Sequence, residues 1–100
     1  MQQRCVAPWI RQEDYLAMKA VCPDDNLPAS FDQWQELATN EVAELEAKGI
    51  TVVKVIIDPQ ELCRWCTAKG IHPNLAGRAA FASYKDIWEE LRRDIRAPLA

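Results

Sequence analysis

Residues Ile50–Ile57, with the sequence ITVVKVII, carry the strongest strand signal in this chain. β-branched side chains dominate the run, and they favour extended backbone. Apolar residues fall on both faces of the predicted strand and are interrupted only by Lys54. A strand of this kind is usually covered on both faces. The rest of the chain must therefore supply two covering layers and a partner for the strand's backbone.

The clearest helix lies just before this strand. Ser30 and Gln33 have the spacing of a capping box, in which each side chain bonds the other residue's backbone N–H. Apolar residues then recur at helical intervals up to Lys48, and Gly49 supplies a left-handed stop. These signals predict a helix over residues 31–48.

Three further helices follow from similar signals. Residues 12–21 have a short helical pattern. Asp58 and Pro59 predict a capped helix after the strand, and Gly70 ends it. A last helix begins near Asn74. Its apolar residues, at steps of three or four, are Phe81, Tyr84, Trp88, Leu91 and Ile95.

Together these elements predict the α+β fold class. We expect residues 1–100 to form a single compact, mostly helical domain, in the order α-α-β-α-α around one apolar strand. A short N-terminal strand over residues 4–7 is an open option. Pro8 lacks the N–H that a longer ladder would need, so we expect such a strand to stop there.

The composition excludes several functional classes. Apolar residues make up 49 % of the chain, which is too many for a disordered protein, yet no run is long enough to span a membrane. The net charge of −3 disfavours a general nucleic-acid binder. The first residues have no signal-peptide pattern. We therefore expect a cytoplasmic protein without a membrane partner.

Cys63-Arg64-Trp65-Cys66 is the one motif that suggests thiol or metal chemistry. With Asp58 as the cap, Cys63 falls in the second helical turn, beyond most of the dipole field that activates redox thiols. His72 is the only histidine available to join a zinc site, which needs four converging ligands. The favoured interpretation is two small core residues. A thiol or zinc site including His72 is an alternative.

A helix-turn-helix can be drawn over residues 60–82. Its second helix would offer Asn74, Arg78 and later Lys85 to nucleic acid. Three polar contacts among many alanines form a small reading surface, and the negative net charge does not attract DNA. A DNA-binding regulator is therefore kept only as a second alternative. The sequence lacks the catalytic motifs of most hydrolases, kinases and dinucleotide-binding enzymes. We therefore expect no catalytic residues, no bound metal and no cofactor.

The open edge of the predicted strand suggests how the protein works. No second segment has comparable β-character, so the same strand of another copy is the favoured neighbour. The alternative is a monomer in which the N-terminal segment and the helices shield the edge. We therefore expect a small interaction or adaptor module that acts by protein binding. It would be a homodimer joined through the strand 50–57, with an additional protein partner that the sequence does not identify.

Overall fold

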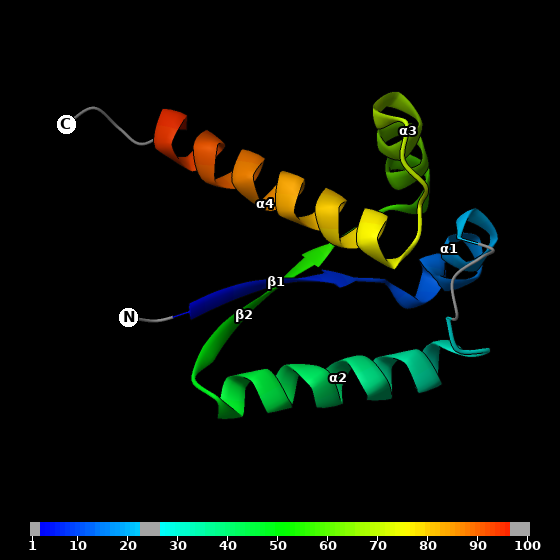
Figure 1. The fold of residues 1–100 in the computed structure, drawn as a ribbon, viewed down its shortest axis with the longest axis horizontal. Helices are drawn as coiled ribbons and strands as arrows, with labels where there is room; N and C mark the ends of the chain where they lie inside the picture. The colour runs from blue at the N-terminus through cyan, green and yellow to red at the C-terminus, as the bar shows by residue number, and fades with distance from the viewer. Residues whose placement is uncertain (1–2, 23–26, 97–100) are drawn as a thin grey trace.

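The computed structural model, which describes residues 3–22 and 27–96, is built on a parallel pair of strands (Figure 1). β1 (Gln3–Trp9) lies beside β2 (Ile50–Ile56), with Gln3 opposite Ile50 and Trp9 opposite Ile56. Parallel neighbours require a long crossover connection. Here the short 3-10 helix η1 (Gln12–Asp14) and two α-helices supply it.

Pro8 does not end β1, contrary to the expectation that the strand would stop at residue 7. The strand runs through Pro8 to Trp9, and Pro8 lies opposite Val55. The Trp9 carbonyl accepts a hydrogen bond from the Ile57 N–H at 3.0 Å, so Trp9 faces β2. Because successive residues of a strand alternate, the nitrogen of Pro8 faces away from β2. A proline in that position costs the ladder nothing.

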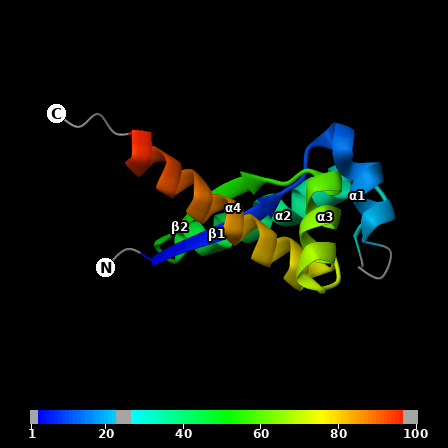
Figure 2. The same cartoon turned by 90° about the horizontal axis from the view of Figure 1, so that it is seen from above.

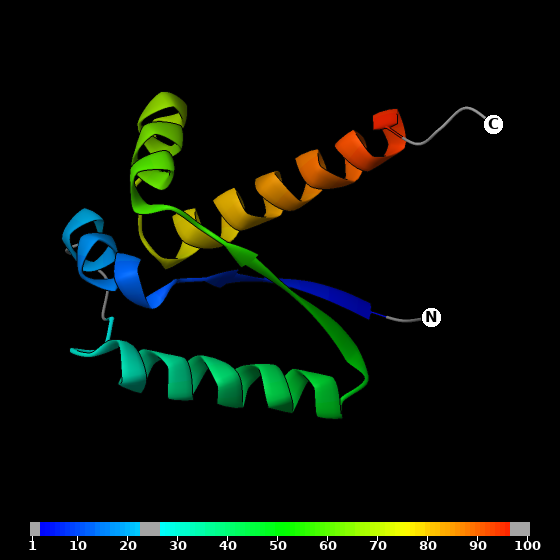
Figure 3. The same cartoon turned by 180° about the vertical axis from the view of Figure 1, so that it is seen from behind.

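Helices cover both faces of the strand pair, as the apolar pattern of β2 predicts. α2 (Phe31–Ala47) lies on one face and α4 (Leu75–Arg96) on the other (Figures 1 and 3). Seen from above, α4 crosses the strands diagonally (Figure 2). The predicted α+β class is therefore confirmed, with a small two-stranded sheet among mostly helical residues 3–22 and 27–96.

The predicted helix ends are confirmed by their caps. Ser30 Oγ accepts from the Gln33 N–H at 3.2 Å, and Gln33 Oε1 accepts from the Ser30 N–H at 3.4 Å. α3 (Pro59–Lys69) begins after Asp58, whose carboxylate accepts from the Glu61 N–H at 3.0 Å. Gly70 ends α3 at a φ of 69°, a left-handed conformation that favours glycine.

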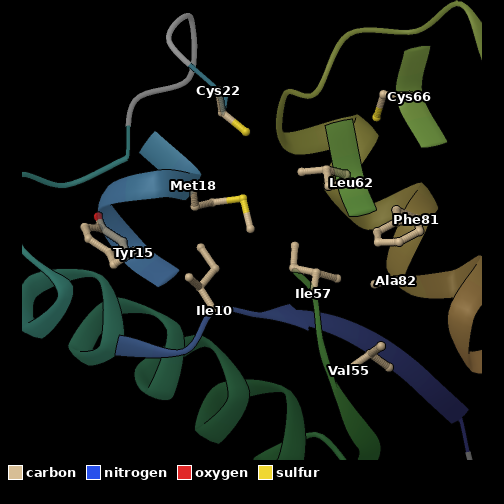
Figure 4. Close-up of a cluster of buried hydrophobic side chains, with 10 residues drawn as sticks. All are labelled: Ile10, Tyr15, Met18, Cys22, Val55, Ile57, Leu62, Cys66, Phe81 and Ala82. Atoms are coloured by element: carbon tan, nitrogen blue, oxygen red, sulfur yellow. The ribbon is translucent and has the colours of Figure 1, made fainter. Parts of the chain in front are cut away.

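The core lies at one end of the strand pair, where α1 (Tyr15–Val21), α3 and α4 meet (Figure 4). Ile57, which directly follows β2, Met18 from α1 and Leu62 from α3 are fully buried there. The other buried members of this cluster are Ile10, Tyr15, Cys22, Val55, Cys66, Phe81 and Ala82. Burial of one such side chain contributes roughly 1.5–3 kcal/mol, so this cluster is the main source of stability.

Gly77 lets α4 pass close to the end of α3. A Cβ built at this position would lie 2.3 Å from the His72 carbonyl oxygen and 3.5 Å from Cys66 Sγ. The first distance is far shorter than a van der Waals contact, and backbone would have to move to relieve it. Gly77 therefore serves close packing at the start of this helix.

Candidate functional site

The two cysteines of the CxxC motif lie in different surroundings. Cys66 is 1 % exposed and packs in the core, whereas Cys63 is exposed on the outer side of α3. Burial raises the pKa of the Cys66 thiol above its ordinary value, which disfavours the reactive thiolate. The interpretation of both cysteines as core residues is therefore right for Cys66 and wrong for Cys63. Helical spacing of three does not fix which of two residues faces inwards.

The other residues proposed for a thiol or zinc site do not join these thiols. Arg64 and His72 are exposed, and Trp65 is half-buried against α4. Within residues 3–22 and 27–96, no three histidine, cysteine or acidic side chains converge as metal ligands would. Among the described residues, Cys63, Arg64, Trp65, Cys66 and His72 therefore do not converge into a set of metal ligands.

The residues proposed for nucleic-acid contact are buried or make hydrogen bonds within the protein. Asn74 Oδ1 accepts from the Gly77 N–H at 2.9 Å, as a helix cap does. Arg78 is only 5 % exposed, and Lys85 Nζ donates to the Ile56 carbonyl oxygen at 3.0 Å. Arg78 is thus not presented to a groove. The DNA-binding alternative stays a hypothesis that this placement does not favour.

The outer edge of β2 is the first candidate binding surface, because it has backbone N–H and C=O groups without a partner in the described chain. Because the Ile57 N–H bonds to Trp9, the alternation of the ladder turns the N–H and C=O of Val52 and Lys54 away from β1. Among the described residues, Lys85 is the one side chain that donates to this edge, at Ile56. Unpaired strand edges are templates for pairing with another strand.

The outer edge of β1 is different, because it carries Pro8 beside the outward Arg4 and Val6. Pro8 has no N–H to offer, and Arg4 is clamped by a bidentate pair to Asp86 at 2.6 and 2.7 Å. Glu90 lies 3.3 Å from the same guanidinium. The Asp86 hydrogen bond is the main cause that raises the pKa of Arg4. This clamp ties the start of β1 to α4.

α4 turns part of its apolar line away from the sheet. Phe81 is buried, but the outward stripe, defined as Tyr84, Ile87, Trp88 and Leu91, is 40–56 % exposed. Polar residues of α4 face the sheet instead, where Asp86 binds Arg4 and Lys85 binds Ile56. Contiguous exposed apolar surface of this kind marks interaction sites.

A cleft of about 370 Å³ lies beside the outward stripe. We call it the aromatic cleft. Its α4 residues are Phe81, Tyr84, Lys85, Trp88, Glu89 and Arg92, and Glu61 of α3 forms the opposite wall. Trp65 supports the cleft from behind, with ring centroids 5.4 Å from Phe81 and 5.5 Å from Tyr84. Sequence reasoning missed this site because its residues come from two helices whose contact is not local.

Comparisons with known proteins add no family or activity. No family model, no curated protein and no solved structure matches this chain. No helix within the described part of the chain is long and apolar enough to cross a membrane.

Proposed function

We propose that this chain acts by protein binding, as a homodimer joined through the outer edge of β2. The observation that carries the proposal is the unequal treatment of the two sheet edges. At the β1 edge Arg4 and Val6 keep their outward N–H and C=O groups but Pro8 has no N–H, whereas at the β2 edge Val52 and Lys54 keep all of theirs without such an interruption.

The available stretch of β2 is complementary to itself in antiparallel pairing. With a two-fold axis at Val52, the two Val52 residues face each other and exchange both backbone hydrogen bonds. Ile50 of one copy then lies opposite Lys54 of the other, so the two Lys54 ammonium groups are kept apart. Lys85 covers the Ile56 carbonyl and thereby sets the end of the paired region.

A second copy fits this edge better than an isolated peptide strand because it continues the layers as well. α2 and α4 already cover the two faces of the β1–β2 pair. A copy related by the two-fold axis would place its own α2 and α4 beside them. The result is a four-stranded sheet in the order β1-β2-β2-β1, with both faces covered. Sheets of three or more strands are far more stable than isolated pairs.

The outward stripe supports protein binding as the role of the assembled dimer. Pairing at β2 uses the plane of the sheet, whereas Tyr84, Ile87, Trp88 and Leu91 face away from the sheet. Each copy would therefore still present its stripe to a further protein, which is what an adaptor requires.

Light scattering over a dilution series in the micromolar range tests the proposal. One chain has a mass of 11.4 kDa. The proposal predicts about twice that mass, falling toward one chain as the protein is diluted. A mass of one chain throughout the series would overturn the homodimer.

A further inference from the structure

We infer that the aromatic cleft binds an arginine side chain of a partner protein. The inference rests on the proposed protein-binding function and names the chemistry that its outward surface recognises. Three features of the cleft support it: a corner of aromatic rings, carboxylates from two helices, and a resident lysine that is already engaged.

The aromatic corner is formed by Tyr84 and Trp88. Their ring centroids lie 6.2 Å apart with an angle of 74° between the planes, so each ring offers a face at a different orientation. The two residues are 40 % and 46 % exposed, so these rings are accessible from solvent. Aromatic faces attract cations through their quadrupole, and tryptophan does so most strongly. A cation that lies in the corner beside the two rings can contact the exposed part of each.

The carboxylates of the cleft come from opposite walls. Glu61 belongs to α3 and Glu89 to α4, and both line the same volume. Among the described side chains, neither carboxylate forms an ion pair. Two carboxylates that no described basic side chain pairs with, beside accessible rings, are complementary to a positively charged group that has a flat apolar face.

The basic residues of the cleft leave room for such a group. Lys85 is directed to the Ile56 carbonyl oxygen at 3.0 Å and lies 5.7 Å from the Phe81 ring centroid. It therefore belongs to the β2 edge as much as to the cleft. Arg92 lies one turn beyond Trp88 and is the only other base that lines the described cleft. Its charge opposes a cationic ligand, so its removal offers a control of known direction.

Arginine suits this arrangement better than lysine. A guanidinium is planar, stacks on aromatic rings and presents several N–H donors to carboxylates at the same time. An ammonium is a compact and strongly hydrated charge that does not stack. A purely apolar ligand would leave the Glu61 and Glu89 carboxylates unused.

Three short peptides that differ at one position test the inference: acetyl-Gly-Arg-Gly-amide and its lysine and glutamine counterparts. The readout is the indole N–H resonance of Trp88 in the uniformly ¹⁵N-labelled full chain. We expect a saturable shift with the arginine peptide at millimolar concentration, weaker binding of the lysine peptide, and no saturable shift with glutamine. Trp88→Ala should weaken binding of the arginine peptide by roughly five- to thirtyfold, followed through the Tyr84 backbone amide.

Two charge variants complete the test. Glu89→Gln should weaken arginine binding by about two- to fivefold, as expected for an exposed charge pair. Arg92→Gln is the matched control, because it removes a neighbouring charge of opposite sign, and it should leave binding unchanged or tighter. Helical circular dichroism establishes that each variant is folded.

Several results would overturn the inference. Equal binding of the lysine peptide refutes the selection of arginine, and an equal shift with the glutamine peptide refutes charge recognition. Unchanged affinity in Trp88→Ala places the peptide elsewhere. The mass of the wild-type protein is measured in parallel. If the wild-type protein has the mass of two chains but does not bind the arginine peptide, only the arginine inference is overturned. If the protein has the mass of one chain, the homodimer is overturned.

Discussion

The two outer edges of the sheet show opposite solutions to the same physical problem. β1 places Pro8 at an outward position and ties Arg4 to Asp86 and Glu90. β2 places Val52 and Lys54 at outward positions and leaves their backbone groups available. Natural sheets often protect their edges with proline and charge. A chain that protects one edge and leaves the other open directs association to the open edge.

The comparison also explains why a proline is tolerated in a strand with a hydrogen-bonded neighbour. Strand residues alternate between facing the neighbour and facing away. Pro8 falls in the second class because Trp9 accepts from Ile57. If the register shifted by one residue, the ladder would lose a hydrogen bond at Pro8. The position of this proline therefore helps to fix the register as well as to close the edge.

Two single proline variants at adjacent positions of β2 are expected to have the largest effects, one on stability and the other on association. Val55 faces β1 and is 5 % exposed, so Val55→Pro removes a ladder bond inside the core. We expect a loss of about 3 kcal/mol or more and an unfolded or aggregated protein. Lys54 faces outwards, so Lys54→Pro should leave the fold intact and produce a monomer. Circular dichroism and light scattering measure the two effects.

Lys54→Ala is the matched control for the outward position. It removes the ammonium, which lies 4.4 Å from the Trp9 ring centroid, but keeps the N–H at the edge. The mass of two chains should persist in this variant. Folded dimers in both Lys54 variants would contradict the assignment of β2 as the joining edge.

Ser30→Ala separates stability from association. The substitution removes the oxygen that accepts from the Gln33 N–H at the start of α2, far from both outer edges. It should lower the free energy of unfolding by about 1 kcal/mol, measured by urea denaturation. The mass in native buffer should not change. A loss of dimer in this variant would mean that association depends on overall stability and not on the β2 edge.

Much of this fold follows from local sequence signals. The caps at Ser30 and Asp58 and the stop at Gly70 fix helix ends through bonds between residues close in sequence, and these ends are where the sequence predicts them. The β-branched run that forms β2 is equally local. Such features depend little on the rest of the chain, so pattern reasoning suffices for them.

The candidate sites depend on contacts that the sequence pattern does not contain. The apolar period of α4 is the same whichever way the helix is turned about its axis. Its orientation is set by Arg4 on Asp86 and Lys85 on the Ile56 carbonyl, which join distant residues. In the same way, the direction of the Pro8 nitrogen depends on register with a strand far along the chain. The outward stripe and the outward position of Pro8 at the β1 edge were therefore beyond prediction.

Pro8→Ala probes the protected edge and should have the smallest effect on stability. The variant restores an N–H at the outward side of β1. The unfolded chain gains freedom, so the free energy of unfolding should fall by roughly 0.4–1 kcal/mol. Both edges would then be able to pair, and we expect species larger than two chains in light scattering at high concentration. An unchanged distribution of masses would show that Pro8 does not protect the edge.

Amide hydrogen exchange along the two strands tests the central claim most directly, because it reports on each edge in the unmodified protein. The Val53 N–H faces β1 and should be protected at every concentration. If β2 joins the two copies, the Val52 and Lys54 amides should also be protected at concentrations where the mass is that of two chains, and dilution should remove their protection. The Val6 amide, at the β1 edge, should exchange rapidly throughout. Rapid exchange of Val52 and Lys54 in a solution of dimers, or concentration-dependent protection of Val6 in their place, would contradict the account.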